Sequence, residues 1–448
     1  MTSNITEPII QVGIVTATQI LFRLNGMFAA SNKRIYSGRQ VAVYRSGSIL
    51  FDGMRLKELT FTATSLQDSF ELKNVAIGIG FHWERRETQC FKGDLKLITE
   101  QGKLTAINRI GVENYLTSVI SSEMSATASD ELLKAHAVIS RSWLLKPILE
   151  PGTRNQELRS ATEQKKTNYK LSTKNHIKWY ERDAHTRFDV CADDHCQRYQ
   201  GITRASTDAV KKAIEATRGE LLTYKNKICD ARFSKSCGGA SETFENCWAP
   251  KHHPYLTKVI DNPTEPEGFE MDLTVEANAY NWIRNNPEAF CNTSDKKILE
   301  QVLNNYDQET TDFYRWEVEY SQAELLEIIE RRSGIEFGKI VDLIPVKRGE
   351  SGRIVHLKIV GTKRTVTVGK ELEIRKWLSN SHLYSSAFVV DKTEIVDGIP
   401  QKFILTGAGW GHGVGLCQIG AAVMGEKGYK YHEILLHYFR GAELKRVY

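Results

Sequence analysis

The chain has 448 residues, a length that fits two or three domains and excludes a single small module. Apolar residues make up 41% and charged residues 26%, a composition typical of a globular protein, which excludes extensive disorder and collagen-like repeats. The 60 Lys and Arg against 55 Asp and Glu give a net charge of +5, too small to predict a nucleic-acid surface. An acidic polymer remains compatible with this charge.

Neither a signal peptide nor a membrane span is visible in the sequence. The first eleven residues have no basic region, and the apolar run from Val12 to Phe22 is interrupted by polar residues. Nowhere do about eighteen apolar residues follow one another, as a spanning helix requires. We therefore expect a chain without a membrane span, either soluble or a mature form whose leader is missing. Eight cysteines are too few to predict a disulfide scaffold.

The spacing of apolar residues predicts an α+β fold. Short alternating runs between Ile9 and Ile107 predict a β-rich N-terminal region, to which we assign residues 1–105. From Val112 to about Leu145 the spacing becomes helical. We assign residues 106–448 to a second domain of mixed α/β structure.

Two insertions interrupt this second domain. The first, at 146–200, is polar and Lys-rich after Pro147, and the second, at 262–338, contains two segments of helical spacing, 273–285 and 321–333. After 338 we expect strands up to 405, among them 353–361 and 364–369, and then a glycine-rich loop and helices from 416 to 439.

A carboxylate lies on an apolar helix face. At about 100° per residue, a sector of about 60° contains Val112, Leu116, Val119 and Glu123. Burial of a carboxyl disfavours its charged form and would raise the pKa of Glu123 toward neutrality, as a general acid requires. The alternative is a helix-terminal Glu that faces solvent or pairs with a base.

The following helix contains one charge in an otherwise buried stretch. Residues 135–145 are apolar almost all round, and Arg141 is the only formal charge among them. A buried guanidinium needs an anion, for which the candidates are Glu123 and a ligand held between the two helices. A purely structural salt bridge is the alternative.

A cluster of four metal-ligand residues occupies a short loop, here called the His/Cys loop: His185, Cys191, His195 and Cys196. Two thiolates and two imidazoles are a usual set for tetrahedral zinc. The adjacent ligands at 195 and 196 require a tight turn, which Asp193 and Asp194 could help to form. This is not the spacing of a nucleic-acid-binding zinc finger. The alternative is a disulfide between Cys191 and Cys196.

Two glycine-rich segments are candidates for ligand contact. In the first, at 233–239, the hydroxyls of Ser234 and Ser236 precede Gly238 and Gly239, which permit a sharp turn and close approach to a ligand. A plain turn is the alternative interpretation of this segment.

The second glycine-rich segment spans 406–418. Five glycines alternate from 407 to 415 around Trp410 and His412, and Gln418 follows. The segment is neither a Walker loop nor a dinucleotide fingerprint. Such a loop can bring an indole ring and backbone amides against a bound polymer. Alternatively it is a turn required by packing, with His412 in the core.

Five motifs together resemble the stage II sporulation protein D and amidase-enhancer (SpoIID/LytB) family of bacterial cell-wall proteins. They are YLTSVISSEM at 115–124, LKAHAVISRSW at 133–143, DVCADDHCQRY at 189–199, FSKSCGG at 233–239 and GWGHGVGLCQIGA at 409–421. They occur in the family's order from residue 115 to the C-terminal region. Residues 1 to about 105 and 262–338 contribute little to this resemblance.

The resemblance implies a lytic transglycosylase that cleaves peptidoglycan between N-acetylmuramic acid and N-acetylglucosamine. Glu123 would be the single acid and base, although the family's Glu-Met-Pro reads Glu123-Met-Ser here, which puts the local backbone in doubt. Arg141 would hold Glu123 or a sugar substituent. The seven residues of the glycine-rich segments would grip the glycan: Ser234, Ser236, Gly238, Gly239, Trp410, His412 and Gln418.

The resemblance also implies the metal and the compartment. The family's zinc ligands match His185, Cys191, His195 and Cys196, and zinc would brace the loop beside the cleft. The family works in the cell envelope or outside the cell, although no leader is visible in this chain. If that compartment is oxidising, Cys237 and Cys247 are the candidate disulfide pair.

Two other functions compete with the transglycosylase. The enhancer branch of the family would bind glycan without cutting it and would assist a cell-wall amidase. A zinc-dependent hydrolase is the third possibility, disfavoured because a site with two Cys and two His leaves no position for water.

Overall fold

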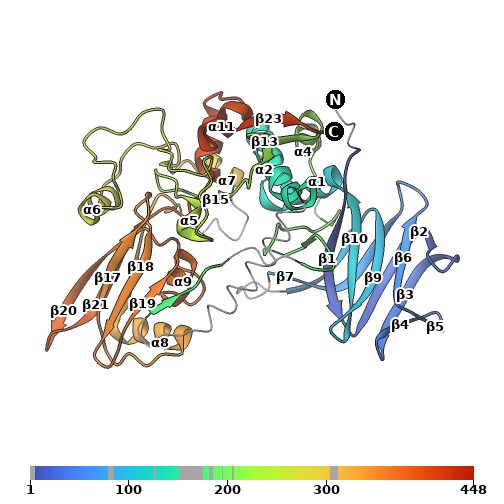
Figure 1. The fold of residues 1–448 in the computed structure, drawn as a ribbon, viewed down its shortest axis with the longest axis horizontal. Coiled ribbons are helices and arrows are strands. Elements are labelled where there is room, and N and C mark those ends of the chain that lie inside the picture. Colours follow the sequence, from blue (N-terminus) through green and yellow to red (C-terminus); the bar gives the residue numbers. More distant parts are fainter. Residues whose placement is uncertain are drawn as a thin grey trace.

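The α+β class predicted from the sequence is confirmed. The computed structural model describes residues 6–78, 85–125, 128–150, 175–180, 185–193, 195–203, 206–302 and 311–448. Figure 1 shows a helical centre between an N-terminal sheet and a lobe built from two smaller sheets. None of the helices in these ranges is long and apolar enough to span a membrane.

The N-terminal sheet has eleven strands in the described ranges, ten of them consecutive in the chain. The strands are β1 (Ile9–Ala17), β2 (Gln19–Ala30), β3 (Ile35–Arg45), β4 (Ser48–Phe51), β5 (Met54–Leu56), β6 (Glu58–Ala63), β7 (Ser69–Ile77), β8 (Arg85–Phe91), β9 (Asp94–Glu100), β10 (Lys103–Gly111) and β12 (Val190–Cys191). The alternation that predicted strands is real: in β2, every second residue from Ile20 to Leu24 is buried. Phe22, Phe51 and Phe61 pack together beneath the sheet.

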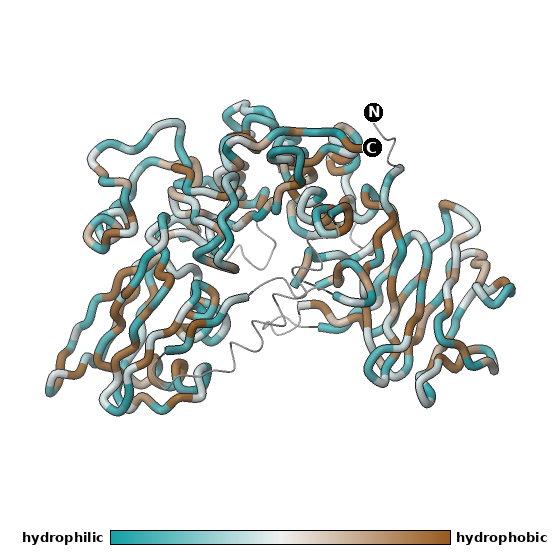
Figure 2. Tube along the Cα trace, in the orientation of Figure 1, coloured by the Kyte–Doolittle hydropathy of each residue, from teal (hydrophilic) through white to brown (hydrophobic). Residues whose placement is uncertain are grey.

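The helical centre contains the segment predicted to be buried. Its elements are α1 (Val112–Glu123), α2 (Asp130–Leu149), α4 (Asp208–Ala216), β13 (Glu220–Tyr224), β14 (Lys227–Ile228), β15 (Phe233–Ser234), α5 (Phe244–Cys247), α7 (Lys296–Val302), β22 (Leu416–Cys417), α10 (Gln418–Glu426), α11 (Tyr431–Tyr438) and β23 (Glu443–Arg446). Every residue of α2 from 135 to 145 is buried, and Figure 2 shows apolar colour in these helices. Helix α2 continues four residues beyond the predicted end, with Pro147 inside its last turn.

The two-sheet lobe contains the remaining elements: β11 (Asn175–Ile177), α6 (Glu276–Arg284), β16 (Arg315–Ser321), α8 (Gln322–Ser333), β17 (Ile340–Arg348), β18 (Ile354–Gly361), β19 (Thr365–Gly369), α9 (Glu371–Trp377), β20 (Phe388–Val396) and β21 (Ile399–Ala408). Its sheets have the orders β11-β19-β18-β17 and β16-β21-β20 and share one apolar core. The expected helices at 273–285 and 321–333 are α6 and α8.

The predicted second insertion, 262–338, differs from the units of this structure. Strand β16 lies inside that range, but it pairs with β21 along its whole length. Helix α8 packs on β16 and on β21. Hydrophobic periodicity marks single elements and carries no information on which sheet a strand joins, so the boundary expected at 338 divides a unit that the structure keeps together.

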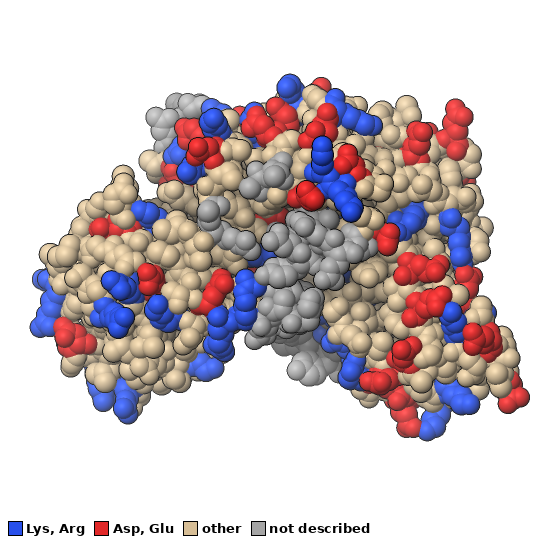
Figure 3. All heavy atoms as spheres, turned by 180° about the vertical axis from the view of Figure 1, so that it is seen from behind, with Lys and Arg blue, Asp and Glu red and all other residues tan. Residues whose placement is uncertain are grey.

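The first insertion links the two outer parts of the molecule. Strand β11 joins the two-sheet lobe through parallel pairing with β19, and β12 joins the N-terminal sheet through parallel pairing with β1. Residues 151–174, residues 181–184 and Asp194 of this insertion lie outside the described residues. On the face shown in Figure 3, Lys and Arg are interspersed with Asp and Glu.

Candidate functional site

Glu123 is the last residue of α1, the helix that the apolar spacing predicted, so it is helix-terminal as in the alternative interpretation. Val112, Leu116 and Val119 are fully buried on the same helix, and the Glu123 side chain remains half-buried at its end. The backbone N–H of Arg198 donates a hydrogen bond of 3.2 Å to Oε1 of Glu123. The carboxyl therefore lies where α1 meets the segment that follows the His/Cys loop.

The turn after Glu123 is held from another helix. The backbone N–H of Ser125 donates to the Gln301 carbonyl at 3.0 Å, and that of Ser129 donates to Gln301 Oε1 at 2.9 Å. A proline at position 125 would have no N–H for the first of these bonds. Ser125, which stands where the resembled motif has proline, thus fixes this turn to α7.

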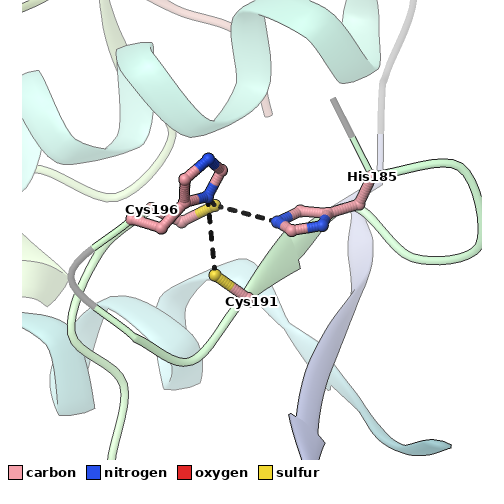
Figure 4. Close-up of side chains that lie close together, drawn as sticks. His185, Cys191 and Cys196 are labelled. Carbon is pink, nitrogen blue, oxygen red and sulfur yellow. Dashed lines mark hydrogen bonds between the residues drawn. The ribbon is translucent and has the colours of Figure 1, made fainter. Parts of the chain in front are cut away.

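The four side chains of the His/Cys loop converge. Cys196 Sγ lies 3.4 Å from His185 Nε2 and 3.4 Å from His195 Nδ1, and Cys191 Sγ lies 3.7 Å from His195 Nδ1 (Figure 4). All four ligand atoms lie within 4.8 Å of one another. The backbone N–H of Cys196 donates to the Asp193 carbonyl, which forms the tight turn expected between adjacent ligands.

These distances suit a single metal ion. Bond lengths of about 2.3 Å to sulfur and about 2.0 Å to nitrogen separate tetrahedral ligand atoms by about 3.3–3.8 Å. Hydrogen bonds, foremost with Cys196 and then with His185 and His195, lower the pKa of Cys191 to about 2 despite its burial. The environment therefore favours a thiolate, which is the metal-binding form of cysteine.

The His/Cys loop is anchored on the N-terminal sheet. Val190 and Cys191 pair with Val12 and Gly13 of β1, and Asp189 accepts a hydrogen bond from the Gln11 backbone N–H at 2.8 Å. This anchoring places the metal-ligand group at the edge of the sheet, next to the helical centre.

The segment after the loop packs against α1. Tyr199 stacks on Tyr115 with ring centroids 4.9 Å apart, and its hydroxyl donates to Asn108 Oδ1 at 2.6 Å. The Gln200 backbone N–H donates to Ser118 Oγ at 3.1 Å. Residues 197–200 thereby connect the metal-ligand group to the helix that ends at Glu123.

A pocket of about 460 Å³ lies between the His/Cys loop and the N-terminal sheet. His185, Cys191 and His195 contribute to its wall, together with residues of β1 and β7. Glu123 is not one of the described residues that line it. The hollow thus adjoins the metal-ligand group.

Arg141 pairs with Glu113 and not with Glu123, which was one of the two candidate anions. Its Nη2 and Nε donate to the two carboxylate oxygens of Glu113 at 2.6 and 3.0 Å, and its Nη1 donates to the Glu220 carbonyl at 3.1 Å. Arg141 is fully buried, and Glu113 is 6% exposed. The structural salt bridge, which was the alternative, is the arrangement found.

The two glycine-rich segments lie side by side. Strands β15 and β22 pair in parallel, and Ser236 forms a bridge with Trp410. A Cβ on Gly238 would lie 2.8 Å from the Gly409 nitrogen, and one on Gly239 would lie 2.7 Å from the Trp282 ring. Both glycines are therefore required by packing, as in a plain turn.

The hydroxyl oxygens of Ser234 and Ser236 are buried in this pairing, and neither has a hydrogen-bond partner among the described residues. Neither hydroxyl is accessible to a glycan in this structure. Their proposed role in binding stays a prediction.

Trp410 and His412 retain partial exposure on the second segment. The Trp410 ring lies 4.2 Å from that of Tyr384 and 4.7 Å from that of Phe313, between centroids. His412 packs edge-on against Trp248, and burial, reinforced by nearby arginines, keeps its pKa well below the ordinary value. A neutral His412 accepts the Val414 backbone N–H at Nδ1, which leaves the proton on Nε2.

Gln418 is buried, with 3% exposure, and contacts another part of the core. Its Nε2 lies 3.1 Å from Nε2 of His136 on α2, whose Nδ1 lies 3.2 Å from Ser140 Oγ. The carbonyl of Ser140 accepts from Gln197 Nε2, one residue after the His/Cys loop. Helix α2 therefore connects the glycine-rich segments with the region around the loop.

Two buried charged residues support the glycine-rich segments and were missed from the sequence. Arg353 donates to the carbonyls of Gly411 and Cys237, at 3.2 and 3.1 Å, and to Ser351 Oγ. Glu242 accepts the backbone N–H groups of residues 243, 350 and 351. Both belong to segments of ordinary charge density, so no pattern in the sequence marks them as buried.

The expected Cys237–Cys247 disulfide is not formed. Cys247 Sγ lies 3.8 Å from the His412 carbonyl oxygen, whereas Cys237 Sγ lies 3.7 Å from Cys291 Sγ. Closeness in sequence suggested the pairing, but the turn at residues 238 and 239 directs the two thiols to different neighbours.

Comparisons with known proteins match two parts of the chain. Residues 100–224 match the family model described as stage II sporulation protein, and residues 242–415 match a domain of unknown function, DUF8618. The first range contains Glu123 and the His/Cys loop. The second contains most of the two-sheet lobe and the loop that carries Trp410.

Three relatives extend the similarity over most of the chain. An uncharacterized protein of Brachyspira hyodysenteriae is 25% identical over 79% of this chain and 72% of its own length. Stage II sporulation protein D of Bacillus amyloliquefaciens is 21% identical over 76% of each chain. The amidase enhancer of Bacillus subtilis is 22% identical over 73% of this chain but only 40% of its own length.

Proposed function

We propose that this chain, which carries a domain of the SpoIID/LytB family at residues 100–224, is a peptidoglycan lytic transglycosylase of the cell envelope. The observation that carries this proposal is the position of Glu123 at the junction of α1 with the segment after the His/Cys loop. The family is connected with the cell wall through relatives named stage II sporulation protein D and amidase enhancer. Peptidoglycan glycan strands are the proposed substrate.

One carboxyl is sufficient for this reaction. Glycosidases normally use two carboxylates because one must act as nucleophile or as base for water. In the transglycosylase, Glu123 first gives its proton to the glycosidic oxygen as the bond from the muramyl anomeric carbon breaks. The carboxylate then takes the proton of the muramyl C6 hydroxyl, whose oxygen closes on that carbon. The products are a 1,6-anhydro end, a free N-acetylglucosamine hydroxyl and a reprotonated Glu123.

The surroundings of Glu123 suit both halves of the cycle. At the C-terminus of α1, the helix dipole disfavours the ionised carboxylate and so favours the acid form. The Arg198 N–H stabilises the carboxylate that forms once the proton has left. Arg141 acts at a distance from this chemistry by holding the first turn of α1 through Glu113.

We assign zinc to the His/Cys loop, with His185, Cys191, His195 and Cys196 as ligands. Soft thiolates with imidazoles favour zinc over magnesium or calcium. Four protein ligands complete a structural site, so the ion would brace the loop and take no part in bond cleavage. Trp410 and His412 would contact the glycan from the neighbouring segments.

Mass spectrometry of the products from purified glycan strands tests the proposal, with Glu123→Gln beside wild type. The matched control is Glu300→Gln, an exposed carboxyl on the same α7 that holds the turn after Glu123. We expect anhydro-muramyl ends from wild type and control and none from Glu123→Gln. Reducing ends would refute the one-carboxyl mechanism.

The amidase-enhancer function is the alternative, favoured by the relative of that name. It predicts retained glycan binding without any cleavage product and a rise in the activity of a cell-wall amidase when this chain is added. The same incubations, followed by sedimentation with glycan, distinguish the two functions.

A further inference from the structure

A second group of metal-ligand side chains lies in the core, away from the His/Cys loop. It consists of Cys237, Asp261, Cys291 and Cys417, and one ligand atom from each lies within 4.8 Å of all the others. Their exposures are 2%, 0%, 1% and 0%. We propose that these four residues bind a second structural metal ion, of the thiophilic tetrahedral class to which zinc belongs.

The distances support one ion. Cys237 Sγ and Cys291 Sγ lie 3.7 Å apart, and the tetrahedral edge for two zinc–sulfur bonds of about 2.3 Å is about 3.8 Å. Three sulfur ligands with one carboxylate oxygen favour zinc over magnesium or calcium, which prefer oxygen alone. The four residues come from four separate segments of the chain, so an ion would connect them all.

The carboxyl of Asp261 is fully buried and has hydrogen-bond donors but, in the described part of the chain, no cationic side chain beside it. It accepts hydrogen bonds from the Cys291 backbone N–H at 2.8 Å and from the Tyr438 hydroxyl at 2.5 Å. Among the described residues, no Lys, Arg or His forms an ion pair with it. Fully buried carboxylates are usually paired or bound to metal, and outer hydrogen bonds of this kind orient metal ligands.

Cys417 contributes its ligand atom from the start of helix α10. This residue is the N-cap of α10, and its Sγ accepts the Cys237 backbone N–H at 3.2 Å. Gly420 in the first turn leaves room for the carboxylate, because a Cβ there would lie 2.5 Å from Asp261 Oδ1. The first turn of α10 thus packs directly against this carboxylate.

An ion at this position would stabilise the paired glycine-rich segments. Cys237 follows β15 and Cys417 belongs to β22, and these two strands pair. The inference depends only on the ligand set and is independent of the transglycosylase proposal, so loss of activity is not its readout.

Metal content per chain tests the inference. Wild-type chain is purified with Zn²⁺ under reducing conditions, dialysed and analysed by mass spectrometry of the elements. We expect two zinc ions in wild type and one in each of Cys196→Ser and Cys291→Ser. The control is Cys247→Ser, a buried thiol outside both groups, which should retain two.

Titration of metal-free protein with Co²⁺ identifies the ligands. Charge-transfer absorption increases with the number of thiolates bound to Co²⁺. The ion that remains in Cys196→Ser has three thiolate ligands and the ion that remains in Cys291→Ser has two, so their absorption should be in a ratio of about 3:2. The titration of wild type alone remains decisive if Cys291→Ser fails to fold. Saturation at one equivalent, or a Cys237–Cys291 disulfide in the peptide map of wild type, would overturn the inference.

Discussion

The Arg198 backbone N–H donates to the Glu123 carboxylate two residues after Cys196, the last of the clustered ligands in the His/Cys loop. Two residues of backbone therefore separate a metal-ligand side chain from the group that contacts the proposed acid. A well-ordered His/Cys loop therefore fixes the position of the Arg198 N–H that contacts Glu123.

Loss of a ligand in the His/Cys loop should reduce both stability and cleavage. In Cys196→Ser we expect one fewer bound zinc, a lower unfolding temperature and about a tenfold or larger fall in the rate of anhydro-end formation, because the Arg198 N–H is no longer held. Zinc analysis, thermal unfolding and product assays measure the three effects. Cys90→Ser, a thiol outside both ligand groups, is the control, and unchanged stability after zinc loss would contradict the structural role.

Arg141 is expected to affect stability more than chemistry. Arg141→Met leaves Glu113 buried with only the Gly219 N–H and Tyr448 hydroxyl as donors, and breaking such a pair costs about 3–5 kcal/mol. Urea unfolding measures the loss. The double variant with Glu113→Gln should lose less than the sum of the single changes. An undiminished free energy of unfolding in Arg141→Met, together with abolished cleavage, would restore a direct role for this arginine.

Acid should destabilise the fold through buried histidines. Burial lowers the pKa of His136 from 6.5 to about 3, so the unfolded chain binds the proton more readily between these values. Stability is thus complete above pH 6.5 and falls as the pH drops toward 3, by about 1.5 kcal/mol between pH 6.5 and 5 for this group.

Unfolding by urea at several pH values measures this slope. His136→Gln should flatten it relative to wild type, whereas the control His432→Gln, at an exposed position, should leave it unchanged. Equal slopes in wild type and His136→Gln would show that His136 does not contribute to the acid sensitivity.

Trp410 should contribute to glycan affinity. Removal of its ring in Trp410→Ala is expected to weaken binding about tenfold, since a partly exposed aromatic face contributes about 1.4 kcal/mol on contact. Sedimentation of the protein with purified glycan gives the affinity. Tyr280→Ala, an exposed aromatic residue on α6, should bind as wild type does. Unaltered affinity in Trp410→Ala would leave the ring a packing role against Tyr384.

Local patterns predicted local features of this protein. Apolar spacing located α1, α2, α6 and α8, and the short spacing from His185 to Cys196 predicted side chains that do converge. Such features depend on residues near in sequence, whose relative positions follow from helix or turn geometry.

Features formed across the chain could not be predicted in this way. Glu113 was not a candidate partner for Arg141 because Glu113 lies beside the apolar face of α1 and not on it. Its carboxylate becomes buried only when Tyr448 and Gly219 pack on that turn of the helix. Cys291 lies 54 positions from Cys237, and their proximity depends on the path of the intervening segment. Neither relationship leaves a periodic signal.

The salt bridge of the helical centre has a consequence for the order of events during synthesis on the ribosome. Tyr448 reaches Glu113 across 335 positions, and β23 completes the sheet begun by β13. Strands β1 to β10, by contrast, pair among themselves within the first 111 residues. We expect the N-terminal sheet to assemble while translation continues, whereas the helical centre must wait for the segment around residue 448, a delay that leaves α2 exposed to chaperones.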